Sequence, residues 1–198
     1  IEKYSSKKIQ ALNFGVYFTD LAFASSFSEN ASILSYFGTI KILSDDLGIS
    51  NALDAAIYEK VEANLENDDA DSLLFLSNET YFKAYSYLEE NERGSTLALI
   101  VLGGWIESLY IMTNLGEYEE GGNLVARIGE QKLTVENLMG FMMKYQDDSN
   151  VAEVMEELAD IEELFWSFEE EEGDDVTTEQ EGDVYVLSGG STIMVSSE

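Results

Sequence analysis

The chain has 198 residues, of which 40 are acidic and 10 are basic, so its formal net charge is −30 at pH 7. Such a charge repels nucleic acid phosphates and anionic lipid surfaces, which leaves cations, basic proteins and neutral ligands as partners. Cysteine and histidine are both absent, which excludes thiol nucleophiles, imidazole bases, Cys/His zinc sites and disulfides. The hydrophobic fraction of 45% supports a core, and the lack of proline fits a mostly helical chain.

A first helix is predicted to run to about Phe27, with Ser5 or Ser6 as its N-cap. One apolar stripe of this helix also contains an acid, Asp20. The apolar members of that stripe are Leu12, Val16, Phe23 and Phe27. The other side is apolar as well, through Phe14, Phe18 and Leu21. We therefore expect a helix with little polar surface.

Three further helices are predicted before residue 92. The first follows a loop at 28–30 and ends near Leu47, where Gly48 is a left-handed stop. The second begins at Ser50 and runs to about residue 65, and the third covers 73–91. The apolar stripe of the second is formed by Leu53, Ile57 and Val61.

The stretch 97–115 is the longest apolar run in the chain, and it is apolar on nearly all faces. This pattern is typical of a helix surrounded by other helices. A membrane-spanning helix needs about 20 apolar residues with few or no charges. Here Glu107 interrupts the run and the pair Gly103–Gly104 dilutes it, so a buried core helix is the better interpretation.

The remaining helices are predicted from their caps. A short helix ends near residue 131, Thr134 caps a helix to Tyr145 with Leu133 packed on Leu138, and Ser149 caps a helix to about residue 170. The buried face of that last helix is predicted to contain Val151, Met155, Leu158, Leu164 and Phe165. The acidic block 169–175 is expected to be a solvated linker. Residues 183–187 and 191–195 are predicted to form a β-hairpin around Gly189–Gly190.

The second half of the sequence repeats the order of elements in the first. A shift of about 87 residues places Asp20 on Glu107, which suggests duplication of a four-helix unit. We therefore predict an all-α fold of about eight helices. The helical domain is expected to cover 1–172, with pseudo-repeats at about 4–92 and 94–172. An acidic extension containing the hairpin follows at 173–198.

Asp20 and Glu107 are the most informative polar residues, because each lies within an apolar helix and is flanked by aromatic residues. A buried acid without a partner costs several kcal/mol or takes up a proton. One interpretation is a ligand or cation pocket between the two helices, with Tyr17, Trp105 and Tyr110 as its walls. The alternative is structural: each acid accepts hydrogen bonds from a Tyr, Ser or Lys and fixes helix register.

Enzymatic activity is not expected, because no histidine or cysteine can act as base or nucleophile. The alternative enzyme hypothesis is a carboxylate-based glycan hydrolase, which needs two acids about 5–10 Å apart. The acidic turns 67–71 and 147–150 lack the glycine and terminal glutamate of a calcium loop. We therefore expect no catalytic residue, no cofactor and no metal site.

The segments Gly15–Phe23, Tyr36–Ile49 and Gly103–Tyr110 are similar to segments of a known family. They resemble uncharacterised, all-helical lipoproteins of the bacterial cell envelope, and the likeness extends over about 4–168. The resemblance implies a helical fold and a location in the cell envelope, but no chemistry. Since the chain begins at Ile1 and ends on a Ser-Ser-Glu helix start, we expect truncation at both ends. Any lipid anchor would precede Ile1, and membrane contact is expected only through it.

The leading hypothesis is therefore a non-enzymatic cell-envelope protein that binds a partner protein or a small ligand.

Overall fold

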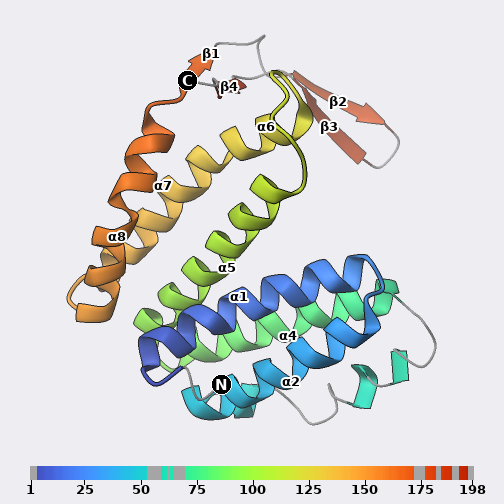
Figure 1. Ribbon diagram of the computed structural model, residues 1–198, viewed down its shortest axis with the longest axis vertical. Helices are drawn as coiled ribbons and strands as arrows, with labels where there is room; N and C mark the ends of the chain where they lie inside the picture. The colour runs from blue at the N-terminus through green and yellow to red at the C-terminus, as the bar shows by residue number, and fades with distance from the viewer. Residues whose placement is uncertain are drawn as a thin grey trace. The chain divides into compact units, whose positions relative to one another are not determined.

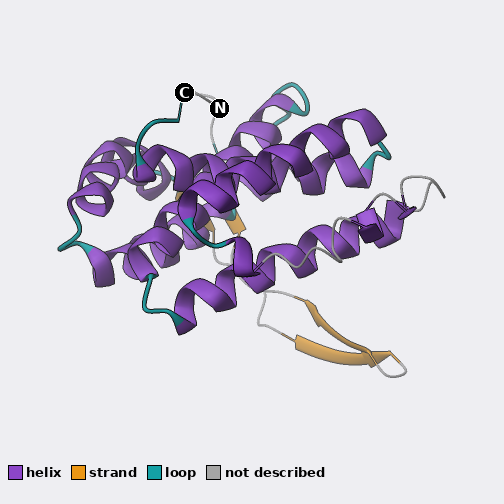
Figure 2. Cartoon of the chain, turned by 90° about the horizontal axis from the view of Figure 1, so that it is seen from below, coloured by secondary structure: helices purple, strands orange, loops and turns teal. Residues whose placement is uncertain are grey.

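The structure is a computed structural model, and it describes residues 4–52, 59–61, 63–64, 70–171, 177–181, 184–188 and 192–195. Within these residues the fold is all-α, and strands are confined to short pieces near the C-terminus (Figures 1 and 2). This confirms the predicted fold class. The α-helices are α1 (Lys7–Ser26), α2 (Asn30–Leu47), α4 (Ala70–Glu90), α5 (Gly94–Asn114), α6 (Asn123–Gly129), α7 (Gln131–Met142) and α8 (Ser149–Trp166). Two short 3-10 helices are η1 (Ser50–Ala52) and η2 (Met143–Tyr145).

Several predicted helix ends are confirmed. Ser6 is the N-cap of α1, and its Oγ accepts a hydrogen bond from the Ile9 N–H at 3.2 Å. Gly48 ends α2 in the left-handed conformation, with φ 68°. The Arg93 guanidinium donates to the Leu47 carbonyl at 2.9 Å and to the Gly48 carbonyl at 3.3 Å. This contact places a positive charge at the negative end of the α2 dipole.

The predicted start of α7 is wrong. The helix begins at Gln131, three residues before the expected cap Thr134, and Leu133 is 60% exposed rather than packed on Leu138. The cause lies in the residue between α6 and α7, because Glu130 has right-handed helical dihedrals. The chain therefore passes from one helix to the next without the extended residue that a side-chain cap requires.

The chain divides into two compact units. Unit 1 comprises Ile1–Tyr110 and Phe141–Ala152, and unit 2 comprises Ile111–Gly140 and Glu153–Glu198. The division does not follow the predicted boundaries near residues 93 and 172, and the duplicated four-helix unit stays a prediction.

The core of unit 1 lies among α1, α2 and α4. Helices α1 and α2 form a hairpin, and α1 also contacts α4 (Figure 1). The buried positions of α1 are Ala11, Phe14, Gly15, Phe18, Leu21, Ala24 and Ser25. This is the second of the two apolar sides seen in the sequence. The stripe that contains Asp20 is less buried, and its members Phe23 and Phe27 are exposed.

The helix predicted from Ser50 begins as the 3-10 turn η1, and its stripe residues Leu53 and Ile57 lie outside the described residues. The third stripe residue, Val61, is buried. On α8 the buried positions are Val151, Val154, Leu158 and Phe165. Leu164, which was predicted to be buried there, is 57% exposed.

The strands of unit 2 are paired differently from the prediction. They are β1 (Glu169–Glu171), β2 (Thr177–Glu181), β3 (Val184–Ser188) and β4 (Thr192–Met194). Each sheet has two antiparallel strands, and β3 pairs with β2 while β4 pairs with β1. The predicted strands exist, but they do not pair with each other. Part of the expected acidic linker is strand β1, and the predicted turn at 189–190 lies outside the described residues.

Candidate functional site

The candidate site begins where α1 crosses α5 within unit 1. A Cβ atom added to Gly15 would overlap the Ile100 carbonyl oxygen, and one added to Gly103 would overlap the Leu12 carbonyl oxygen. Glycine at these positions therefore lets the two backbones touch. The Thr19 hydroxyl donates to the Gly104 carbonyl at 3.1 Å and ties the helices together at the same point. The contact confirms that the two apolar helices pack on each other.

This crossing brings Asp20 and Glu107 together. Glu107 follows Gly103 by one helical turn, and Asp20 is next to Thr19, so both acids lie just beyond the glycine contact. Their carboxyl groups form a hydrogen bond with each other. Two carboxylates have no proton to donate, so this hydrogen bond forms when one of the pair carries a proton.

The electrostatics of the pair follow from burial and from this hydrogen bond. Burial raises the pKa of the Asp20 carboxyl, and the hydrogen bond with Glu107 offsets part of the rise. Burial also raises the pKa of the Glu107 carboxyl, and the charge of Asp20 and the hydrogen bond raise it further. Both carboxyl groups therefore keep their protons to a higher pH than exposed carboxyl groups, and the hydrogen bond favours Glu107 over Asp20 as the protonated partner.

Tyr17 and Tyr36 lie near the acid pair, and Tyr4 contacts Tyr17. The Tyr17 and Tyr4 hydroxyl oxygens are 3.2 Å apart, and the Tyr17 and Tyr36 ring centroids are 5.9 Å apart. The hydrogen bond with Tyr4, burial and nearby negative charge, including that of Asp20, raise the pKa of Tyr17 to about 12. Burial and then the charges of Asp20 and Glu107 raise the pKa of Tyr36. Both phenols therefore stay protonated at neutral pH.

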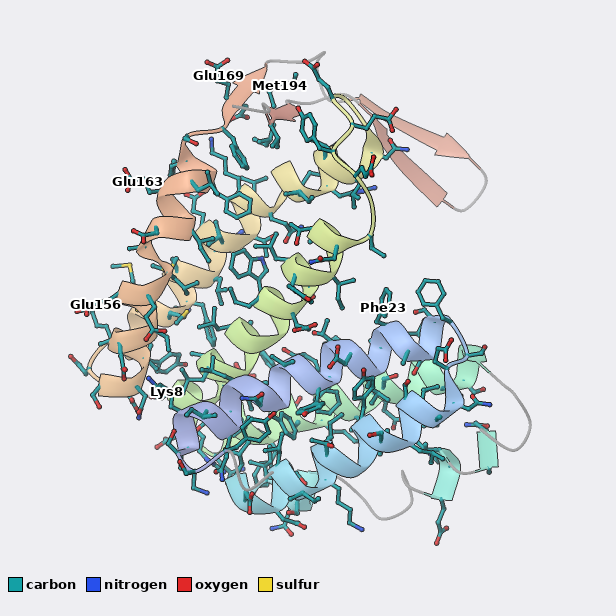
Figure 3. All side chains as sticks on the ribbon, in the orientation of Figure 1. Lys8, Phe23, Glu156, Glu163, Glu169 and Met194 are labelled. Atoms are coloured by element: carbon teal, nitrogen blue, oxygen red, sulfur yellow. The ribbon has the colours of Figure 1, made fainter. Side chains whose placement is uncertain are left out.

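A cavity of about 350 Å³ opens at the end of the α1–α2 hairpin. Its walls come from the last turns of α1 and the first turns of α2. The lining residues are Asp20, Phe23, Ala24, Phe27, Glu29, Ser32 and Tyr36. The Phe23 and Phe27 ring centroids are 4.9 Å apart, and Figure 3 labels Phe23 near the C-terminal end of α1. Asp20 thus links a partly buried acid pair to an aromatic-lined opening.

The structure brings together three of the five residues predicted for a site. Asp20, Glu107 and Tyr17 belong to one cluster, as described above. Trp105 is buried and lines a separate cavity of about 370 Å³ with residues of α1, α4 and α5, among them Phe18 and Tyr81. Tyr110, which follows Glu107 by three positions on α5, is 61% exposed. Neither aromatic residue lines the Asp20 cavity.

Sequence reasoning did not assign Phe23, Phe27 and Tyr36 to the site. The signal for the two phenylalanines was present, since they share the helical stripe of Asp20. Tyr36 lies on another helix, and nothing in the spacing of α2 pointed to α1. Only the hairpin, with Ser28 at φ 56° in its short connection, brings these residues face to face.

Among the described residues, no group of three His, Cys, Asp or Glu side chains could hold a metal ion. Helix α5 is the one described helix that is long and apolar enough to cross a membrane, judged by length and composition. A buried core helix passes the same test, and Ala98, Ile100 and Leu102 of α5 are buried here.

Comparisons with protein-family models, curated proteins and solved structures found no match. The site is therefore interpreted from its own geometry.

Proposed function

We propose that this protein is a non-enzymatic binding protein of the cell envelope that holds a small ligand in the Asp20 cavity. The proposal depends on one observation: a partly buried carboxyl group lines an opening together with three aromatic side chains, those of Phe23, Phe27 and Tyr36. Ligand sites commonly combine apolar and aromatic walls with a few polar groups that fix orientation. The location in the cell envelope is supported by the family resemblance of the sequence alone.

The carboxyl pair counts against the alternative of a glycan hydrolase. Such enzymes place their two acids on opposite sides of the scissile bond, about 5–10 Å apart. Here the two carboxyl groups are hydrogen-bonded to each other, which leaves no room for a sugar between them. Aspartic proteases also pair two carboxyl groups, but both of those acids face the substrate. In this chain Asp20 lines the cavity and Glu107 does not.

The proposal is tested by searching for a ligand that purifies with the protein. Native mass spectrometry of the whole chain is expected to show an added small-molecule mass. The mass should disappear in Phe27→Ser, which removes one wall of the cavity. It should persist in Phe75→Ser, a matched change at an exposed phenylalanine on α4. A chain that carries no such mass, and that no member of a diverse small-molecule set protects from thermal unfolding, would contradict the proposal.

A further inference from the structure

The lining of the Asp20 cavity narrows the chemical class of its ligand. We infer that the ligand is a small organic cation, an ammonium group with apolar substituents, held between the Asp20 carboxylate and the rings of Phe23, Phe27 and Tyr36. This inference rests on the proposed function and deepens it.

Three aromatic side chains line the cavity, those of Phe23, Phe27 and Tyr36. Phe23 and Phe27 pack with their rings tilted by 54°, and Tyr36 faces them from α2 across the cavity. The face of an aromatic ring is electronegative and attracts an ammonium group within about 6 Å of its centre. Apolar substituents on the nitrogen would in turn bury against the same rings and against Ala24.

The charged groups around the cavity also favour a cation. The titratable groups near the acid pair are Tyr17 from α1, whose pKa responds to Asp20, and Tyr36 from α2, whose pKa responds to Asp20 and Glu107. Glu29, the N-cap of α2, adds an exposed carboxylate to the cavity wall. The phenols are uncharged at neutral pH, so the charge beside the cavity comes from the carboxyl groups, which favour a cation and repel an anion. The net charge of −30 would attract the same ligand from a distance.

An inorganic cation fits less well. Calcium binds about six to eight oxygen ligands, which proteins usually supply from a dedicated loop. This cavity offers the two carboxyl groups of Asp20 and Glu29 and a few hydroxyl groups, and the rest of its lining is apolar. The ligand is therefore expected to be organic.

The test is calorimetric titration of the full-length chain with choline and with its uncharged isostere, in which carbon replaces the ammonium nitrogen. Salt at about 150 mM suppresses long-range attraction between choline and the acidic surface. We expect choline to bind about tenfold more tightly than the isostere, or better.

The outcomes separate this inference from the proposed function. Equal binding of choline and the isostere at the Asp20 cavity would overturn the cation inference but leave a ligand site there. Choline binding that survives both Asp20→Asn and Phe27→Ser would reveal general attraction to the acidic surface, and would also overturn it. Failure of choline and of a panel of primary and quaternary ammonium probes would do the same. Loss of choline binding in both variants, with Phe75→Ser unchanged, would support it.

Discussion

The acids at the α1–α5 crossing and the acids of α8 differ in number and in surroundings. The comparison shows that burial of an acid, and not the number of acids, shifts its pKa. Helix α8 carries many acids, including Glu156, Asp160 and Glu163, and these three face solvent (Figure 3). The crossing carries two, Asp20 and Glu107, and both have raised pKa values because they are partly buried. Many exposed acids therefore mainly keep a surface hydrated, whereas a partly buried acid beside a close helix contact has a raised pKa.

The largest difference in stability between the two regions is expected when a large apolar side chain on α1 or on α8 is replaced by alanine. Phe14 is fully buried on α1, so Phe14→Ala should lower the free energy of unfolding by about 3–5 kcal/mol. The matched change on α8 is Leu164→Ala at an exposed position, which should stay within about 0.5 kcal/mol of the parent. Urea denaturation measures both. Equal losses would show that α8 has a packed face at Leu164.

A smaller effect is expected from widening the helix contact. In Gly103→Ala the new methyl group meets the Leu12 backbone, which cannot move as a flexible side chain would. We expect a loss of about 1–3 kcal/mol. Gly38→Ala is the matched control, because its new methyl group enters open space on α2 and should add about 0.5–1 kcal/mol. A stabilising Gly103→Ala would contradict the direct backbone contact.

The pH dependence of stability distinguishes the buried acids from the exposed ones. Because the folded state raises the pKa of Asp20 and Glu107, their contribution is fully present below the ordinary carboxyl pKa of about 4. It is lost as the pH rises through the raised values. The double variant Asp20→Asn with Glu107→Gln should therefore unfold at a higher temperature than the parent at neutral pH.

That difference should shrink as the pH falls below about 4, where the parent pair is fully protonated. Thermal unfolding followed by circular dichroism across this range provides the measurement. A double variant that is less stable than the parent at neutral pH would show that the charged form contributes to the fold.

The smallest effect is expected from the exposed acids of α8. Glu156→Gln with Glu163→Gln removes like-charge repulsion on the surface, so thermal stability should rise slightly at low salt. The gain should vanish near 1 M salt, where charges more than about 3 Å apart are screened. The effect of changing Asp20 and Glu107 should be far less sensitive to salt. Equal sensitivity in both regions would mean that the acid pair is as solvated as α8.

The helix ends were predictable because they depend on local chemistry. Ser6 and Gly48 cap their helices through their own side chain or backbone, which needs no distant partner. The start of α7 was not predictable in this way, because α6 is followed almost directly by α7. Thr134 therefore lies inside α7 and not at its N-terminus. Strand pairing failed for a similar reason. The segment 177–181 is too polar to predict as a strand, although the Gly182–Asp183 pair before β3 is a hairpin signal.

The site was half predictable from the sequence. An acid within an apolar helix is visible as a broken pattern, which is how Asp20 and Glu107 were found. Which side of α1 is buried depends on α2 and α4, and the sequence of α1 offers two apolar sides. The sequence therefore could not place Phe23 and Phe27 on the cavity wall. It also could not show that Trp105, on the other side of α5 from Glu107, belongs to a different cavity.

The central claim is that burial raises the pKa values of Asp20 and Glu107 where α1 crosses α5, and that Asp20 raises the pKa of Glu107 further. Carbon-detected NMR titration of the side-chain carboxyl groups tests it most directly, with Asp20→Asn and Glu107→Gln used to assign the signals. Glu107 is expected to titrate above its ordinary pKa of about 4.3, and its pKa should fall towards that value in Asp20→Asn. A Glu107 carboxyl that titrates at the ordinary value, and does not respond to the loss of Asp20, would contradict the account.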